Sequence, residues 1–319
     1  MVNPVAADPP DSAVAGHYGD PYREQRRLSD GLAAVDLSHR PVLRITGPDR
    51  LSWLHSLVSQ HVADLRPGDS TEALVLSPNG HVEHHLHLVE DGEQVLAHVE
   101  PGTADDLIAF LLSMRFMLRV DVSLADDLAI RWHLGDVDGL ATRTGFGCYG
   151  LTSKGSEYAG ELAGAQAMEA LRVAAVRPRL GLDTDHRTLP HEVGWLTTAV
   201  HLDKGCYRGQ ESVARVHNLG RPPRRLVLLH LDGTDSELPS PGTPVQSDGR
   251  DVGRLGTSAR HFELGPIALA LVKRQVPDEA QLEVGGVTAA IDPAASIVLP
   301  ESPARAAAEA RAGLLRLRP

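Results

Sequence analysis

The hydrophobic pattern of this chain changes at Pro222 and Pro223, and that change constrains the fold more than any other feature. Beyond the two prolines, short apolar runs are separated by glycine and proline turns, which is typical of consecutive β-strands. The runs extend over about 75 residues, the size of a small barrel or sandwich. We therefore predict an all-β domain at 223–300 and a separate tail at 301–319. The expected strands are 225–231, 243–246, 252–257, 267–272 and 281–284.

The region upstream of the prolines mixes helical and strand periods, which predicts an α+β arrangement. The full length of 319 residues suggests two or three cores, since a domain averages roughly 150 residues. Asn79-Gly80 favours a tight turn between two strands. Residues 1–28 are rich in Pro, Ala, Asp and Gly without periodicity, so we expect a mobile lead-in there. The expected helices include 104–118, 165–175 and 209–217.

Composition and charge exclude several classes of protein. The formal net charge of -11 disfavours a protein that coats nucleic acid or an anionic membrane. No window is long and apolar enough to span a bilayer, and Asp8 and Asp11 lie where a signal peptide would be basic and then apolar. Cys148 and Cys206 are too few for a disulfide framework, although a single redox bridge between them stays open. We expect a cytoplasmic protein with reduced thiols.

The segment 204–211 combines residue types that favour chemistry. Gly205 and Gly209 permit tight turns and the close approach of a ligand. Cys206 lies between them, and the nearby cations Lys204 and Arg208 would favour its thiolate form. The alternative is that Cys206 is a small apolar residue in a structural turn.

The wider stretch 204–225 is basic in an otherwise acidic chain, with Glu211 as its single acid. It is either a solvated loop and helix face or a seat for a polyanion, such as a polyglutamylated cofactor or RNA phosphates. Its basic residues are Lys204, Arg208, Arg215, Arg221, Arg224 and Arg225.

Lys-Gly-Cys-Tyr-x-Gly-Gln-Glu at 204–211, followed by Ala214-Arg215 and Gly220, resembles the signature of the YgfZ family, relatives of the glycine-cleavage T-protein. Residues 171–183 look like the T-protein's leucine-arginine stretch that ends in glycine and aspartate. Residues 189–192 resemble the proline-x-glutamate that follows it. With the N-terminal landmarks and the glycines of the β-domain, the resemblance covers roughly 30–300.

The resemblance implies a three-domain glycine-cleavage T-protein-like fold of the α+β class with a central folate cleft. Residues 29–222 would form two interleaved α+β folate-binding domains, and the C-terminal domain would be an all-β barrel. Tetrahydrofolate, or a derivative, would be the cofactor. The implied role is the assembly or repair of iron–sulfur enzymes, including ones that modify tRNA. These enzymes would be partners, whereas a membrane or direct nucleic-acid binding is not expected.

The resemblance also marks Cys206 as the working residue, with Lys204 and Tyr207 beside it at the mouth of the cleft. The other residues of the motif loop are Gly205, Arg208, Gly209, Gln210, Glu211 and Arg215. The candidates for folate contacts are Arg172, Asp183 and Glu192.

Two departures separate the chain from the aminomethyltransferase relatives. Glu83 and His84 replace an Asp-Asp pair, and Ala174 stands in place of a glutamate that contacts the pterin. Alanine cannot accept a hydrogen bond through its side chain, so ordinary aminomethyl transfer is disfavoured. Whether the chain is an enzyme stays open. The alternatives are a folate-dependent aminomethyltransferase or demethylase-type one-carbon enzyme, and an RNA-binding adaptor.

A histidine-rich strand raises the question of a metal. If 81–87 is a regular strand, His81, Glu83, His85 and His87 share one face. Three imidazoles and a carboxylate suit zinc, but a wet hairpin face explains the same pattern. We assign no metal.

Overall fold

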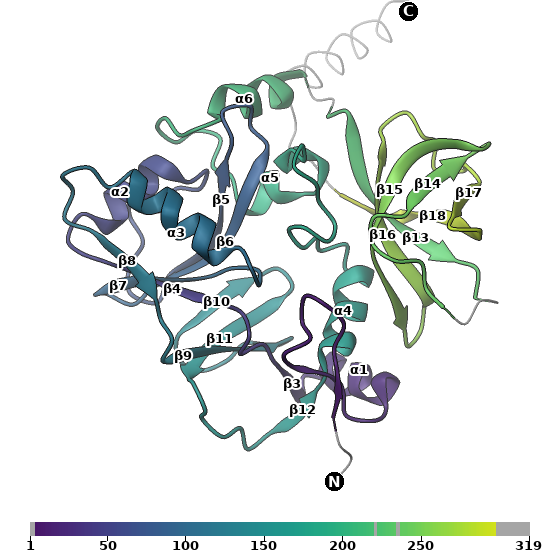
Figure 1. Ribbon diagram of the computed structural model, residues 1–319, viewed down its shortest axis with the longest axis horizontal. Coiled ribbons are helices and arrows are strands. Elements are labelled where there is room, and N and C mark those ends of the chain that lie inside the picture. The colour runs from purple at the N-terminus through teal and green to yellow at the C-terminus, as the bar shows by residue number, and fades with distance from the viewer. Residues whose placement is uncertain (1–3, 220–221, 234–236, 298–319) are drawn as a thin grey trace, which may run out of the picture.

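The computed structural model describes residues 4–219, 222–233 and 237–297. Two five-stranded sheets and a closed six-stranded barrel form its three main bodies (Figure 1). This architecture confirms the predicted α+β class and the C-terminal all-β barrel. No helix within these ranges is long and apolar enough to cross a membrane.

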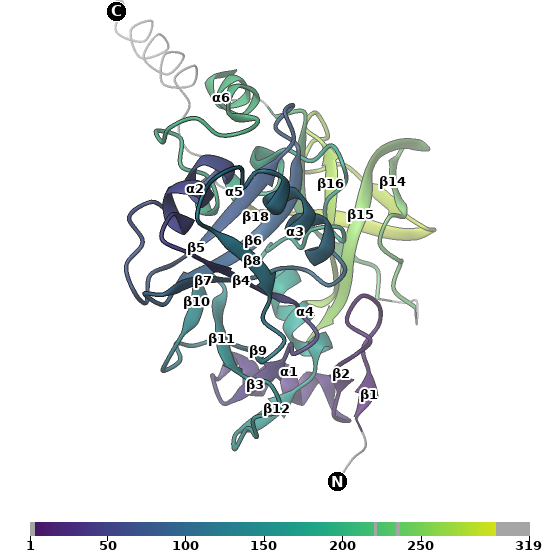
Figure 2. The ribbon, with the colours of Figure 1, turned by 60° about the vertical axis from the view of Figure 1, so that its left-hand side comes forward.

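The first sheet, with strand order β5-β6-β7-β4-β8, is covered on one face by helices α2 and α3 (Figure 2). Trp53 and Leu54 of α2 and Leu107 and Leu111 of α3 pack with strand residues in one core. The predicted turn at 77–80 joins β5 to β6. The elements are β4 (Val42–Thr46), α2 (Arg50–Leu57), β5 (Ser70–Leu76), β6 (Val82–Glu90), β7 (Gln94–His98), α3 (Ala104–Ser113) and β8 (Asp121–Leu124).

The second sheet, with strand order β10-β11-β9-β3-β12, takes β3 from before the first sheet and its other strands from after it. The chain therefore enters this sheet, leaves to build the first sheet and returns. Leu28 of helix α1 and Met168 of helix α4 are buried against it. The elements are α1 (Pro21–Ser29), β3 (Ala33–Asp36), β9 (Leu128–His133), β10 (Ala141–Thr144), β11 (Gly147–Ser153), β12 (Glu161–Ala163) and α4 (Ala165–Ala174).

The barrel closes in the order β13-β16-β15-β14-β17-β18. Along β13, Val227 and Leu229 point into the barrel core, whereas Leu226 and Leu228 pack outward in the core that holds Val173 of α4. Burial on both faces explains the continuous apolar run that followed the two prolines. The strands are β13 (Arg224–Leu231), β14 (Pro244–Ser247), β15 (Arg250–His261), β16 (Gly265–Lys273), β17 (Leu282–Val284) and β18 (Val287–Ser296).

The N-terminal segment differs from the expectation. Residues 4–28 form β1 (Val5–Ala6), β2 (Ala15–His17) and most of α1, so a mobile lead-in at 1–28 is wrong for the part described. Leu28 is fully buried, and Asp11 is buried in an ion pair. Contacts with residues that are distant in the sequence hold this segment in place. Such contacts produce no periodic pattern of apolar residues within the segment itself. The predicted tail, 301–319, lies outside the described residues.

A buried ion cluster centred on Arg179 joins three parts of the chain. The Arg179 guanidinium donates to Asp11 of the N-terminal segment at 2.6 Å and to Glu100 after β7 at 2.6 Å. It also donates to Glu169 of α4 at 3.1 Å. Burial opposes the ionisation of Glu100, but the charges of Arg179 and Arg40 outweigh it and lower its pKa to about 2.

We expect Arg179→Met to destabilise the protein by about 3–5 kcal/mol at neutral pH, because three buried carboxylates would lose the guanidinium that they share and keep one weaker set of partners. The wild-type protein should also lose stability as the pH falls from about 4.5 towards 2, since Glu100 ionises at a lower pH when folded than when unfolded. The variant should show a flatter pH dependence in this window. Urea unfolding at a series of pH values measures both effects.

Arg115→Met provides the matched control. Arg115 pairs with Asp121 across 3.7 Å, and both side chains are exposed, so its loss should cost less than about 1 kcal/mol. Equal unfolding free energies for the two variants would contradict the central role of Arg179.

Candidate functional site

A cavity of about 320 Å³, which we call the central cavity, lies between the two sheets, the end of α4 and the segment 193–198. Its walls come from strands β5 and β6 of the first sheet, from β11 of the second sheet, from the loop after α4 and from helix α5 (Trp195–Thr198), which Figure 1 shows beside β5 and β6. The volume is within the range of small-molecule sites. Residues that line it include Glu72, His85, His87, Phe146, Tyr149, Val176, Arg177 and Trp195.

A β-bulge in β6 changes which of the residues before His85 face the cavity. Val75 pairs with His84 and Leu76 with Val82, so Glu83 is the extra residue of β6. The bulge reverses the alternation, as an extra residue in one strand does. His85 and His87 consequently share a face with Val82, whereas Glu83 turns outward. The expectation that Glu83 would join the two histidines is therefore wrong.

Glu72 and His85 form a buried hydrogen-bonded pair at the cavity wall. The distance from His85 Nε2 to Glu72 Oε2 is 3.1 Å, and Thr198 Oγ1 donates to the same carboxylate oxygen at 3.2 Å. Burial opposes the ionisation of Glu72, but the hydrogen bond and charge of His85 outweigh it and lower its pKa to about 2. The cavity thus contains an ionised carboxylate.

Aromatic rings form another part of the wall. Trp195 lies 4.5 Å from the His85 ring, measured between ring centroids, and Tyr149 lies 4.9 Å from His87. Trp195, Tyr149 and Phe146 are all buried. Flat ring surfaces among polar groups suit a planar heterocycle that also offers hydrogen-bonding atoms.

Arg177 adds a cation to the wall. Among the described residues no carboxylate forms an ion pair with its guanidinium, and its charge contributes to the low pKa of Glu72. It follows Val176, which has a φ of 52°. A β-branched residue in the left-handed region is strained. The backbone N–H of Val176 donates to the Val173 carbonyl, and the N–H of Arg177 donates to the Arg172 carbonyl. These bonds end α4 and set the position of Arg177.

The predicted folate contacts are engaged within the protein. Arg172 donates to Asp183 at 2.7 Å, and Asp183 accepts the backbone N–H of Thr257 in the barrel at 2.7 Å. Glu192 accepts from Arg224 of β13 at 2.8 Å and from the N–H of Leu189. Of these candidates, Arg172 alone contributes to the cavity wall.

Lys204, the first residue of the motif loop, has a structural position. Its ammonium donates to three carbonyl oxygens, those of His55, Val58 and Gln60, at and beyond the C-terminal end of α2. Cations stabilise a helix C-terminus in this way. Burial lowers the pKa of Lys204 to about 8. Gln210 donates to the Lys204 carbonyl at 3.1 Å and closes the loop.

The rest of the loop is packed against the turn between β5 and β6. Gly209 has a φ of 83°, and a Cβ there would lie 2.5 Å from the Ser77 carbonyl oxygen, so glycine is required. Arg208 pairs with Glu83 at 2.8 Å, and Tyr207 is buried in the core. Gly205 and Cys206 are exposed. Glu211 and Arg215 of α6 (Gln210–Leu219) form an exposed pair at 3.7 Å.

The structure therefore separates the two groups of predicted site residues. Cys206 is not among the described residues that line the central cavity. Its expected place at the mouth of a folate cleft stays a prediction. The basic stretch is also largely neutralised. Arg224 pairs with Asp185 and Glu192, and Arg225 pairs with Asp278. Arg221 lies outside the described residues.

Sequence reasoning missed Glu72, Tyr149, Arg177 and Trp195. None of them stands in a recognisable motif, and only Arg177 falls within one of the short segments, 171–183, on which the resemblance to the T-protein rests. Long-range folding brings them together, so no local spacing announces the cavity.

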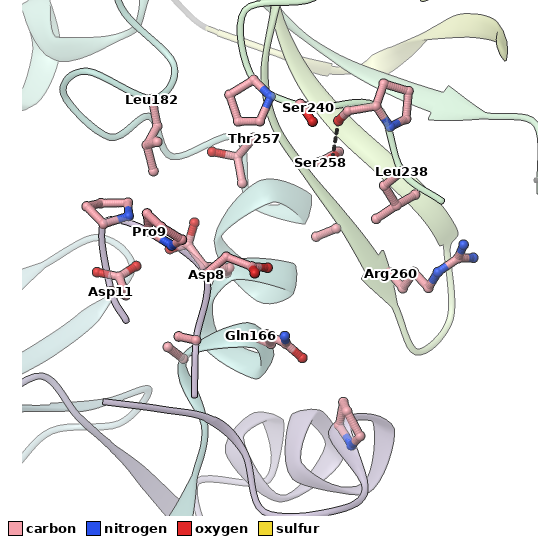
Figure 3. A pocket seen from close by; sticks show the side chains of 18 of the residues that line it. Asp8, Pro9, Asp11, Gln166, Leu182, Leu238, Ser240, Thr257, Ser258 and Arg260 are labelled. Atoms are coloured by element: carbon pink, nitrogen blue, oxygen red, sulfur yellow. Dashed lines mark hydrogen bonds between the residues drawn. The ribbon is translucent and has the colours of Figure 1, made fainter. Parts of the chain in front are cut away.

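A larger cavity of about 830 Å³ lies between the N-terminal segment, α4 and the barrel (Figure 3). Asp8 and Gln166 lie on one side of it, and Leu238, Ser258 and Arg260 lie on the barrel side. Ser258 donates to the Pro239 carbonyl at 2.7 Å. The acids Asp11 and Glu169 at its wall already pair with Arg179. We therefore take the central cavity as the candidate site.

Comparisons with known proteins agree with this fold. Residues 224–296 match the family described as CAF17, C-terminal beta-barrel domain. The chain is 28% identical to an aminomethyltransferase of Moorella thermoacetica, over 80% of this chain and 82% of the relative. It is 25% identical to a chloroplastic Arabidopsis thaliana protein whose name proposes a transferase, over 75% of this chain and 66% of that protein.

The crystal structure of glycine cleavage system aminomethyltransferase T from Bartonella henselae superposes with a TM-score of 0.76. The two chains are 16% identical, and each is covered over 94% of its length. Together these similarities support the assignment of the chain to the T-protein-like superfamily, with a C-terminal barrel similar to that of CAF17.

The two cysteines should differ in reactivity. Both are free thiols, Cys206 is exposed, and Cys148 is buried with its pKa raised by burial. In the native protein we expect a disulfide reagent such as DTNB to modify Cys206 rapidly and Cys148 only after unfolding. The variants Cys206→Ser and Cys148→Ser assign each phase, and rapid native labelling of Cys206→Ser would contradict the assignment.

Proposed function

We propose that this protein binds a reduced folate in the central cavity. The observation that carries the proposal is the wall itself, which combines aromatic rings, an ionised carboxylate and an unpaired guanidinium in a T-protein-like fold. A reduced folate consists of a pterin, an aromatic ring and glutamyl carboxylates. Each of these parts has a group of matching chemistry on the cavity wall. The similar proteins named aminomethyltransferases support the same class of ligand.

The parts of the ligand can be assigned to the wall by chemistry. Trp195 and Tyr149 provide surfaces for the pterin and the aromatic ring. Arg177 suits a glutamyl carboxylate, since a guanidinium binds carboxylates in a fork geometry. The side chains of Arg172 and Asp183 already bind each other. We therefore expect them to hold the cavity wall in place and not to contact the folate directly.

Aminomethyl transfer is not favoured. Glu83 pairs with Arg208 outside the cavity, and the T-protein glutamate is replaced by Ala174 at the end of α4. The residues in place of the expected carboxylates therefore do not offer a proton acceptor to a bound folate.

For the cellular role we propose support of iron–sulfur enzyme assembly or repair, with Cys206 as the working thiol. The support is the resemblance of 204–211 to the YgfZ signature and the exposure of Cys206 on a loop that Lys204, Gly209 and Gln210 hold in place. A rigid loop with one exposed thiol suits a contact with a partner.

Calorimetry with 5-formyl-tetrahydrofolate tests the folate proposal. We expect binding, and we expect Arg177→Met to weaken it by roughly 10–100-fold, the loss of one charge-assisted hydrogen bond. A reduced pterin without a glutamyl tail should bind the variant and the wild-type protein equally.

Arg187→Met is the control, because Arg187 is exposed and does not line the cavity. No binding of 5-formyl-tetrahydrofolate to the wild-type protein at millimolar concentration would refute the proposal. Equal weakening by both variants would refute the role of Arg177.

Complementation tests the role of Cys206. In a strain of the source organism that lacks this protein, we expect the wild-type gene and Cys148→Ser to restore the activity of an iron–sulfur dehydratase after oxidative stress. Cys206→Ser should not restore it. Full restoration by Cys206→Ser would show that the proposed role does not require the Cys206 thiol.

A further inference from the structure

The wall of the central cavity holds a second chemical feature that folate binding does not explain. Glu72 of β5 lies directly opposite His87 of β6 in the strand register, and His85 is two residues away on the same face. Potential ligand atoms of the three side chains all lie within 4.8 Å of one another. Two neighbouring strands therefore present two imidazoles and a carboxylate to one point.

The spacing is close to that of a metal centre. Bonds from a zinc-class ion to nitrogen and oxygen are about 2.1 Å, which places tetrahedral donors about 3.4 Å apart. His85 Nε2 and Glu72 Oε2 are already 3.1 Å apart. Rotation of the His87 ring and the Glu72 carboxylate would complete the set without a change in the backbone.

Unsatisfied nitrogens surround this point. His87 Nδ1 and both ring nitrogens of His98 are buried with no hydrogen-bond partner among the described residues. The His98 ring stacks on His87 with centroids 4.5 Å apart and planes 1° apart. Buried polar atoms are rarely left without a partner, so the unpaired nitrogen of His87 is available to an ion, while His98 packs behind it outside the ligand set.

An outer shell is also present. Thr198 Oγ1 donates to Glu72 at 3.2 Å and would orient the carboxylate. On the other side of the three side chains lies the cavity, which leaves room for water or a substrate atom. Three protein ligands with an open position are the arrangement of reactive metal sites, whereas structural sites are closed by four.

We propose that Glu72, His85 and His87 bind one divalent transition-metal ion of the zinc, cobalt or iron(II) class. Two imidazoles exclude calcium and magnesium as preferred ions, because those ions select oxygen donors. The regular register of β5 and β6 over this stretch places the three side chains together, and the β-bulge at Glu83 only keeps a second carboxylate out of the set. The inference concerns the metal alone and does not depend on folate binding.

The test uses protein purified without a histidine tag, stripped with a chelator and titrated with Co²⁺ in the absence of folate. We expect one equivalent to bind with ligand-field absorption in the visible range, and Zn²⁺ to displace it. His87→Ala and Glu72→Gln should each weaken binding by at least about tenfold, the loss that outer-shell changes alone produce.

His84→Ala is the matched control. His84 lies on the same strand but points to the opposite face, where Val75 packs into the core of the first sheet. Its removal should leave the Co²⁺ affinity unchanged. Zn²⁺ should also raise the urea midpoint of the wild-type protein and not that of His87→Ala, which separates metal binding from misfolding.

Two outcomes would overturn the proposal. One is a wild-type protein that binds neither ion at micromolar concentration, which would leave Glu72 and His85 as a hydrogen-bonded pair only. The other is wild-type affinity in a folded His85→Ala/His87→Ala double variant, which would place the ion elsewhere. Because folate is absent, either result leaves the folate proposal standing.

Discussion

The packing of the N-terminal segment against the two sheets and their helices depends on one buried guanidinium. Arg179 binds Asp11, Glu100 and Glu169, which belong to the N-terminal segment, the end of β7 and α4. Burying these charges is costly, and only the complete set of partners offsets the cost. Arg179 and Glu100 also line the central cavity, so the contact that joins the bodies also makes part of the candidate site rigid.

The positions of the basic residues show how a charged stretch can be used for folding. Lys204 holds the C-terminal end of α2, and Arg224 joins β13 to the loop that carries Asp185 and Glu192. Arg177, a cation at the cavity wall without an ion pair in the described part of the chain, lies outside this stretch. A local excess of charge therefore marks contacts between distant segments here, while the cation at the cavity is a single residue set by the end of a helix.

One extra residue in β6 controls the chemistry of the cavity. Because the bulge shifts the alternation, Glu83 pairs with Arg208 near the motif loop, while His85 and His87 lie on the face toward the cavity. The same shift keeps the Glu83 carboxylate away from the two imidazoles. It also places Arg208 against the turn on which Gly209 packs, so the cavity and the loop share one strand pair.

By itself the sequence determined the α+β class, the hairpin at 77–80, the helix α4 and the barrel. Each of these rests on local periodicity or turn chemistry, as at Asn79-Gly80 and along β13. The resemblance of 204–211 also identified the loop that displays Cys206. The tertiary structure decided which side chains form the cavity, because Glu72, Tyr149, Arg177 and Trp195 are distant in the chain. It also decided the order of the N-terminal segment, whose contact between Asp11 and Arg179 spans 168 positions. Interactions over such separations leave no periodic trace, so only the folded chain reveals them.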